Sequence, residues 1–198
     1  MNTTKQTKQS AFSLVELLVV IGVISFLFAI TIPTLSSIQD SSGLSHGASI
    51  LSSQINYARQ LASSRSKPME VRFIELPGRS GSGYHAIQIW LPDDQDPSQS
   101  RPLNRLAVLP HNILITTADT ERSKLFDHLD PASKMPAGGA ADGADYQAFQ
   151  IRPNGSVVSS ATASQRQDLY LTVISATRDG QSATSDSNYI TVQLNPFT

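Results

Sequence analysis

An unbroken apolar run near the N-terminus dominates the hydrophobic pattern of the chain. From Phe12 to Ile32 the sequence reads FSLVELLVVIGVISFLFAITI, and Glu16 is the only ionisable residue in it. As a helix this run would rise about 30 Å, which is the hydrocarbon thickness of a bilayer. Soluble helices seldom stay apolar on every face for this length. The run therefore predicts a transmembrane helix, with a buried soluble helix as the alternative.

The residues that flank the run predict its orientation. Lys5 and Lys8 precede it, and no acidic residue does. The positive-inside rule places residues 1–11 in the cytoplasm and everything after Ile32 outside it. A secretory signal peptide has the same polarity, but its cleavage would follow the run, where Ala29-Ile30-Thr31 is a poor site. We expect a single-pass protein of the inner membrane with an extracytoplasmic C-terminal domain.

Beyond Pro33 the pattern changes to that of an amphipathic helix. We expect one long helix, roughly Phe12 to Ser64, that ends before Pro68. Pro33 lacks an amide donor and is predicted to kink the helix, and Gly43 and Gly47 favour a bend. The apolar stripe that should pack on a sheet recurs at steps of three and four: Leu44, Ala48, Leu51, Ile55, Ala58 and Ala62.

The rest of the chain alternates apolar and polar residues, as β-strands do. The segments 70–76 and 84–91 should form a hairpin, as should 106–109 with 113–117 across Pro110-His111-Asn112. Asn-Gly in the turn between 149–152 and 156–159 is the strongest hairpin signal. The last two strands are expected at 169–175 and 189–194, and exposed loops at 92–102 and 131–145. The fold class is therefore α+β, with a long N-terminal spine helix packed on a mostly antiparallel β domain.

The start of the apolar run carries a recognisable motif. Ser10-Ala11-Phe12-Ser13-Leu14-Val15-Glu16-Leu17-Leu18-Val19-Val20 resembles the cleavage and methylation site of type IV prepilins. That family has a small residue, usually glycine, then Phe, Thr or Ser, Leu, an aliphatic residue and Glu. Counted from Phe12, Glu16 is fifth and Pro33 twenty-second, as in the family, whereas Ala11 replaces the glycine. The resemblance implies a pilin-like fold, cleavage between Ala11 and Phe12 by a prepilin peptidase, and N-methylation of Phe12.

Glu16 also has a physical rationale within this motif. A carboxylate inside a membrane costs several kcal/mol, so it usually has a partner. Glu16 lies one helical turn from Phe12, and in a filament it could pair with the Phe12 amine of an adjacent subunit. We interpret Glu16 as an assembly residue; the alternative is that it only snorkels into water. Small residues on one helix face, Gly22, Ser25 and Ala29, either allow close helix packing or are unremarkable.

A second, narrower resemblance lies at the end of the helix. Tyr57-Ala58-Arg59-Gln60-Leu61-Ala62-Ser63-Ser64-Arg65, followed by Pro68-Met69-Glu70-Val71-Arg72-Phe73, is similar to H-type minor pseudopilins of type II secretion and to FimT-like pilus proteins. The Verru_Chthon cassette protein D family resembles the same arrangement. The resemblance implies other pilin or pseudopilin subunits, the prepilin peptidase, the inner-membrane assembly platform and, before assembly, membrane lipid as partners. Compared with H-type relatives, the chain is expected to be abbreviated at its end.

These inferences define four segments. Residues 1–11 form a prepilin leader and residues 12–33 the transmembrane half of the spine helix. Residues 34–66 continue the helix, and residues 67–198 form the β-rich globular domain. After processing, the protein should move from the membrane into a periplasmic or cell-surface filament; whether this filament is a pilus or a pseudopilus stays open.

Charge gives little support for a nucleic-acid partner. The formal net charge is −1, so the whole chain is not drawn to polyanions. Arg59, Arg65, Lys67 and Arg72 form a small basic cluster in the sequence, which could contact phosphate. The favoured interpretation is a solvated helix face, or cations that stabilise the helix C-terminus. DNA binding for uptake is therefore one alternative function, and a membrane-anchored extracytoplasmic domain that never polymerises is the other.

Catalytic and metal signatures are missing from the sequence. The four histidines, His46, His85, His111 and His128, lack metal-ligand spacing, and neither a phosphate-binding loop nor a nucleophile elbow occurs. The acidic residues from Asp93 to Asp96 lack the glycine and glutamate of an EF-hand, so a solvated loop is expected, with calcium as the alternative. No cysteine is present, which excludes disulfides and thiolate chemistry. We expect no catalytic residue, no metal and no cofactor, and thus no enzyme.

Overall fold

The computed structural model describes residues 13–79, 81–93, 99–117, 123–136, 141–158, 169–176 and 189–195, with the side chains of 29–40 excepted. The chain divides into two units, residues 1–39 and residues 40–198. All of the described strands belong to the second unit.

One helix, α1, spans Leu14–Arg65, in agreement with the predicted range. It ends in a Schellman motif: the Lys67 N–H donates to the Ala62 carbonyl, and the Ser66 N–H donates to the Ser63 carbonyl, each at 3.3 Å. Ser66 takes the left-handed conformation at this cap, with a φ of 50°. Helices usually place glycine there, because a Cβ makes the left-handed conformation costly.

The strands form two antiparallel sheets, which confirms the predicted α+β class. In the first sheet, β1 (Met69–Ile74) lies between β3 (Ala86–Leu91) and β8 (Asp145–Ile151). The short strands β4 (Arg101–Pro102) and β5 (Ala107–Val108) pair with β3, whereas β7 (Ser133–Lys134) and β9 (Val157–Val158) pair with β8. The second sheet has the order β11 (Tyr189–Gln193), β10 (Tyr170–Ser175), β6 (Ile113–Thr116) and β2 (Gly83–Tyr84).

The predicted strand 84–91 is divided between the two sheets. Tyr84 pairs with Ile115 in the second sheet, whereas Ala86 pairs with Ile74 and Val108 in the first. His85, buried at the corner, is the residue where the chain crosses from one sheet to the other. Gly83 precedes the crossing with a φ of +152°, and a Cβ on it would lie 2.5 Å from a backbone oxygen of β6. The crossing is therefore set by close backbone packing, which alternation in the sequence does not reveal.

The predicted hairpin of 106–109 with 113–117 is wrong. β5 pairs with β3 in the first sheet, and β6 pairs with β10 and β2 in the second. The guanidinium of Arg79 donates to the carbonyls of Leu109 and Pro110, at 2.9 and 3.1 Å, and holds the connection between the sheets. A short apolar segment can fill a place in either sheet, so its partner is decided by long-range packing.

The other strand pairs agree with the sequence. β8 and β9 form the hairpin around Asn154, and Gly155 has a positive φ there. β10 and β11 pair along their length. The two predicted loops contain strand residues: β4 lies in the first, and β7 and the first residue of β8 lie in the second. A 3-10 turn, η2 (Phe126–His128), was not predicted.

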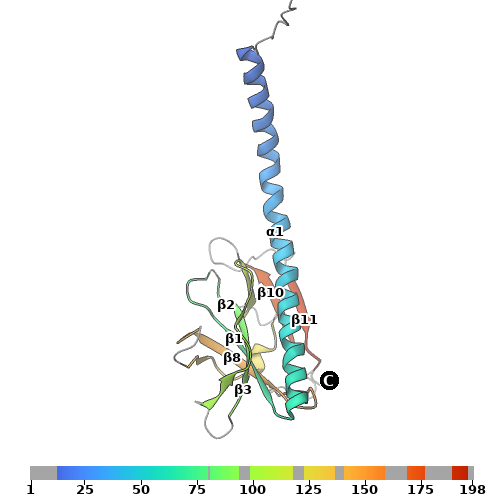
Figure 1. The fold of residues 1–198 in the computed structure, drawn as a ribbon, viewed down its shortest axis with the longest axis vertical. Helices are drawn as coiled ribbons and strands as arrows, with labels where there is room; N and C mark the ends of the chain where they lie inside the picture. Colours follow the sequence, from blue (N-terminus) through green and yellow to red (C-terminus); the bar gives the residue numbers. More distant parts are fainter. Residues whose placement is uncertain are drawn as a thin grey trace, which may run out of the picture. The chain divides into compact units, whose positions relative to one another are not determined.

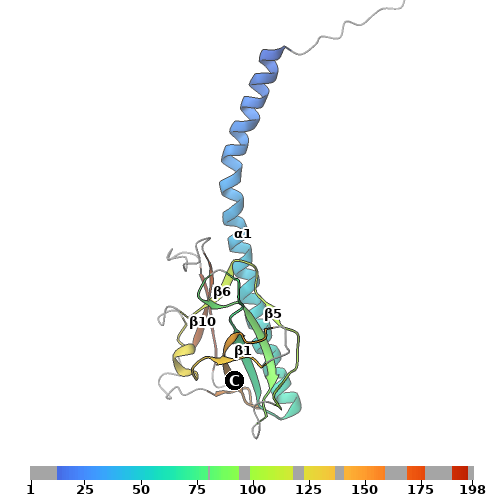
Figure 2. The ribbon, with the colours of Figure 1, turned by 90° about the vertical axis from the view of Figure 1, so that its left-hand side faces the viewer.

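The core lies between the second half of α1 and the two sheets (Figures 1 and 2). The predicted helix stripe is buried in it throughout. Four aromatic rings, from Phe73, Tyr84, Phe126 and Phe149, pack together in it, with centroids 5.1 to 6.1 Å apart. The Tyr84 hydroxyl donates to Gln147 at 2.8 Å. Burial, reinforced by the charges of Glu75 and Asp145, raises the pKa of Tyr84.

Gly43 and Gly47 lie inside α1 without interrupting it. A Cβ on Gly47 would lie 2.7 Å from Ile113 of β6 and 3.3 Å from Val173 of β10. Gly47 therefore permits the helix to approach the second sheet closely. Whether the helix axis bends at these glycines stays a prediction.

Candidate functional site

The N-terminal segment of α1 is the first candidate site. The helix starts at Leu14, and the Leu17 N–H donates to the Ser13 carbonyl at 3.1 Å. Glu16 lies in the first turn with an exposed side chain. A carboxylate at this position interacts favourably with the positive end of the helix dipole. Ala11 and Phe12, the predicted cleavage and methylation site, lie outside the described residues.

Residues 14–28 of α1 expose their apolar side chains on every side. Every large apolar residue from Leu14 to Phe28 is exposed, and the exposed fractions run from 46% for Ile24 to 82% for Leu14. A Cβ on Gly22 would meet nothing within 4 Å. An apolar surface of this extent usually marks a contact with another protein or a membrane.

The structure describes the other predicted residues of α1 to different extents. Ser25 is exposed on α1, and the side chain of Ala29 lies outside the described part of the structure. Pro33 lies within the range of α1, but the kink assigned to it stays a prediction. Among the described residues, no helix is both long and apolar enough to cross a membrane.

The basic cluster read from the sequence is not a cluster in the fold. Arg59 is half-buried on α1 and donates to the carbonyl of Asn195 at 2.8 Å, and burial lowers the pKa of its guanidinium. Arg65 and Lys67 are exposed at the end of the helix. Arg72 lies on the face of the first sheet that points away from α1, because the alternation of β1 puts Val71 and Phe73 in the core.

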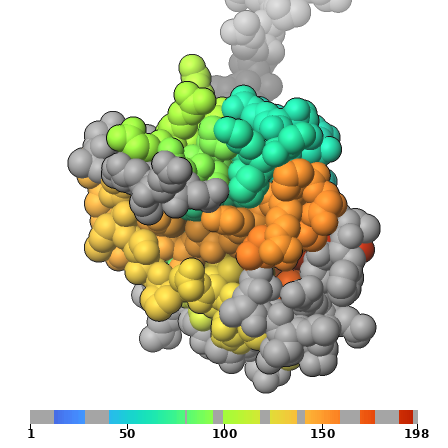
Figure 3. Space-filling view, turned by 90° about the horizontal axis from the view of Figure 1, so that it is seen from below, coloured from blue at the N-terminus to red at the C-terminus, as the bar shows by residue number. Residues whose placement is uncertain are grey.

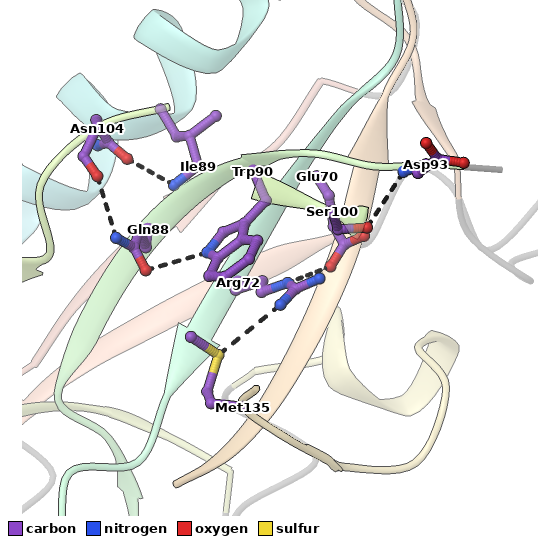
Figure 4. Close-up of polar contacts among 9 residues, drawn as sticks. All are labelled: Glu70, Arg72, Gln88, Ile89, Trp90, Asp93, Ser100, Asn104 and Met135. Carbon is purple, nitrogen blue, oxygen red and sulfur yellow. Dashed lines mark hydrogen bonds and ion pairs between the residues drawn. The ribbon is translucent and has the colours of Figure 1, made fainter. Parts of the chain in front are cut away.

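Arg72 belongs instead to a buried cluster on this outer face (Figure 4). Its guanidinium pairs with Glu70 and lies 4.0 Å from the ring centre of Trp90 and 4.4 Å from that of Tyr146. Such contacts stabilise a cation as it leaves water. Burial raises the pKa of Tyr146, although the charge of Arg72 acts in the opposite direction. Glu70 and Arg72 are two positions apart on one predicted strand. Their ion pair could have been predicted from this spacing, but it was not.

A polar chain connects this outer face to α1, and Figure 4 shows its links from Trp90 through Gln88 to Asn104. The Trp90 indole N–H donates to Gln88 at 3.0 Å, and the Gln88 amide donates to the Asn104 carbonyl at the same distance. The Asn104 side chain accepts from the Ile89 N–H and donates to Gln54 of α1 at 2.7 Å. Between β4 and β5, the Asn104 side chain thus supplies the hydrogen bond that a neighbouring strand would otherwise give to β3.

The histidines and acidic residues that were considered as metal ligands do not converge in the described part of the chain. There, no group of three or more His, Cys, Asp or Glu side chains has the geometry to hold an ion. His46 and His111 are exposed, whereas His85 is buried. The Asp93 N–H donates to Ser100 at 3.1 Å, and Asp94 and Asp96 lie outside the described residues. Calcium binding by this loop stays untested.

Comparison with known proteins identifies the N-terminal segment. The family described as Prokaryotic N-terminal methylation motif matches residues 6–32. No curated protein and no solved structure matches the chain. The match covers the predicted cleavage site, Glu16 and the exposed apolar segment. The motif implies a prepilin peptidase and pilin assembly machinery as partners, and a membrane-anchored N-terminus. The chain therefore carries a prepilin-type N-terminal motif on an α+β fold whose helix packs on antiparallel sheets.

Proposed function

We propose that the chain is a minor pilin or pseudopilin, a structural subunit of a type II secretion pseudopilus or a type IV pilus-like filament. The observation that carries the proposal is the exposed apolar segment 14–28 of α1, which lies within the methylation motif. The globular core does not include the apolar segment, because its buried residues lie between Leu44 and Leu194. The apolar segment is thus available to lipid before assembly and to neighbouring helices afterwards.

Maturation prepares this segment for assembly. Hydrolysis of the peptide bond between Ala11 and Phe12 removes the leader with Lys5 and Lys8, and leaves a free amine on Phe12. A methyl donor then alkylates this amine. In the filament, the carboxylate of Glu16 pairs with the cationic amine of an adjacent subunit, so that two charges are neutralised among apolar helices. The subunit moves from the inner membrane to a periplasmic or cell-surface filament and catalyses no reaction itself.

The test is to replace Glu16 and compare insertion with assembly. Glu16→Ala and Glu16→Leu should still be cut after Ala11, which mass spectrometry of the N-terminus measures, and should still fractionate with membranes. Both should be absent from sheared filaments, while Glu16→Asp, which keeps the charge, should restore part of the incorporation. Normal incorporation of Glu16→Leu would refute the pairing role, and an uncut leader in cells with active peptidase would refute the whole proposal.

The subtype is proposed from the end of the helix. The stretch from Tyr57 to Phe73 resembles H-type minor pseudopilins, FimT-like proteins and the Verru_Chthon cassette protein D family. Within this group a secretion pseudopilin is favoured over a DNA-binding FimT-like pilin. Arg72 is paired with Glu70 on the outer sheet face, and Arg59 is half-buried, which leaves Arg65 and Lys67 as the exposed cations of the segment.

A gel shift separates these functions. Residues 40–198 form one compact unit and can be mixed with a labelled 30-base-pair duplex at several salt concentrations. We expect no retention at physiological salt. Salt-sensitive retention that Arg65→Ala together with Lys67→Ala removes would favour the DNA-binding alternative. A membrane-tethered domain that never polymerises would show an intact Met1, or a cut after the apolar run.

A further inference from the structure

The turn between β8 and β9 contains the only Asn-Gly pair of the chain, Asn154-Gly155. Arg152, Pro153 and Asn154 are exposed, and Figure 3 shows the hairpin (orange) at the surface of residues 40–198. Glycine suits the turn, because Gly155 has a φ of +83°. A glycine after an asparagine also has a chemical consequence, since no side chain shields its nitrogen.

An asparagine in this position can lose its side-chain amide without an enzyme. The Gly155 nitrogen gives up its proton and attacks Cγ of Asn154. The new C–N bond closes a succinimide ring while the Cγ–Nδ2 bond breaks, and the amide nitrogen takes up the proton and leaves as ammonia. One water then opens the ring at either carbonyl, which yields aspartate or isoaspartate. Water is the only co-reactant, and it reaches an exposed turn.

The turn engages both reacting groups in hydrogen bonds. The Gly155 N–H donates to the Arg152 carbonyl at 2.8 Å, so the nitrogen that would attack is held in a backbone bond. The Asn154 Oδ1 accepts from the Ser156 N–H at 3.1 Å and from the Ser156 hydroxyl at 2.7 Å, which fixes the rotation of the side chain. Because the nitrogen has to lose its proton and turn toward Cγ, the turn opens before the ring closes.

The strand pair behind the turn keeps it closed. The Arg152 N–H donates to the Ser156 carbonyl at 2.9 Å, and Ile151 pairs with Val157 directly behind this bond. Ile151 and Val157 are both buried in the main core. A surface hairpin of this kind opens locally, without unfolding of the rest of the globular unit.

We propose that Asn154 is a site of spontaneous deamidation, and that opening of the β8–β9 turn controls its rate. In the closed turn the reaction is suppressed, and in the open turn Asn154 reacts as in an unfolded chain. Isoaspartate lengthens the backbone of the turn, so the pairing of Ile151 with Val157 loses its register. The proposal does not depend on processing or filament formation, because it rests on residues 151–157 alone.

The test compares the full chain in a mild non-ionic detergent with the same chain unfolded in guanidinium chloride, at one mildly alkaline pH. Peptide mapping by mass spectrometry measures the loss of the Asn154 amide over time. Asn112, which is followed by isoleucine, is the internal control. In the unfolded chain, Asn154 should react faster than Asn112. In the folded chain it should react at least about tenfold more slowly than in the unfolded chain, as expected when one or two hydrogen bonds have to open. Equal rates in the two states would overturn the proposal.

Ser156→Ala tests the contribution of the side-chain lock. It removes the hydroxyl donor to Asn154 and keeps the backbone donor, at a residue that is only half-buried. The folded variant should deamidate about threefold faster than the parent, and the two should match in guanidinium chloride. Hydrogen exchange of the Gly155 amide should rise by the same factor, because the same opening frees its N–H. An unchanged or slower reaction would contradict the proposal.

Val157→Ala and Leu51→Ala separate opening of the turn from global unfolding. Val157 anchors β9 in the core, whereas Leu51 is a fully buried residue of α1. Val157→Ala should accelerate deamidation of the folded chain. Leu51→Ala should leave the rate unchanged while the chain stays folded, although it lowers the stability of the whole unit. Equal acceleration by both variants would place the reaction in the globally unfolded chain and overturn control by the turn.

Discussion

Residues 14–28 and residues 44–62 belong to the same helix, yet their apolar side chains have different surroundings. In the first segment, every large apolar side chain is exposed; in the second, the stripe from Leu44 to Ala62 is buried against two sheets. The first segment is apolar on all sides, whereas the second is apolar on one side only. A stripe can be covered by one sheet surface, but a helix that is apolar all round needs neighbours in every direction. We therefore expect molecules outside the chain to stabilise the first segment, as the proposed function requires.

The most direct test of this comparison is to replace a leucine by alanine in each segment. Leu51→Ala should lower the free energy of unfolding of the globular unit by about 2–5 kcal/mol, because Leu51 is fully buried. Leu18→Ala, at a site that is 65% exposed, should change it by less than about 0.5 kcal/mol. Urea unfolding in non-ionic detergent can be followed by the fluorescence of Trp90, the only tryptophan. A comparable loss for Leu18→Ala would show that the globular unit covers the first segment.

Glycines give a second matched pair. Gly47→Ala should destabilise the globular unit by about 1–3 kcal/mol, because the new methyl group would overlap Ile113. Gly22→Ala should leave the unfolding of that unit unchanged, since its surroundings in the chain are open. If Gly22 serves close helix packing in a filament, Gly22→Leu should reduce incorporation into sheared filaments. Full incorporation of Gly22→Leu would leave Gly22 as an unremarkable helix residue.

Alkaline pH should affect the globular unit through Tyr84, whereas residues 14–28 contain no tyrosine. The folded state raises the pKa of Tyr84 above its ordinary value near 10, so the unfolded chain releases this proton first. Stability from the neutral phenol is complete below about pH 10 and declines above it, by at most about 1.4 kcal/mol per pH unit. Urea midpoints at pH 8, 10 and 11 test this. Tyr84→Phe should flatten the decline, and a Tyr84→Phe profile identical to the parent would contradict it.

Replacing one polar residue in each segment should give the smallest difference in unfolding free energy. Gln54→Ala removes the acceptor of the 2.7 Å hydrogen bond from Asn104 and should cost about 1 kcal/mol in unfolding free energy. Glu16→Ala should cost nothing measurable in the same assay, since Glu16 has no partner in the described part of the chain. Its effect is expected only in assembly. A loss of unfolding free energy in Glu16→Ala would point to a contact with the globular unit.

Local pattern was sufficient for the parts of the fold that depend on neighbours in the sequence. The helix range, the buried stripe and the hairpin at Asn154-Gly155 were predicted, because helical period and turn chemistry are short-range properties. The chain crossing at His85 was not predicted, and neither was the pairing of β5 and β6 in different sheets. Arg72 was grouped with Arg59, Arg65 and Lys67 because they are close in sequence, whereas the alternation of β1 places Arg72 on the sheet face that points away from α1.

The sequence by itself determined the N-terminal motif, the position of Glu16 within it and the helix that presents them, because these are encoded in consecutive residues. Tertiary structure alone decided that Arg72 lies against the rings of Trp90 and Tyr146, and why Gly47 is a glycine. Each of these depends on strands that are distant in sequence and meet only when backbone hydrogen bonds and side-chain packing are satisfied together.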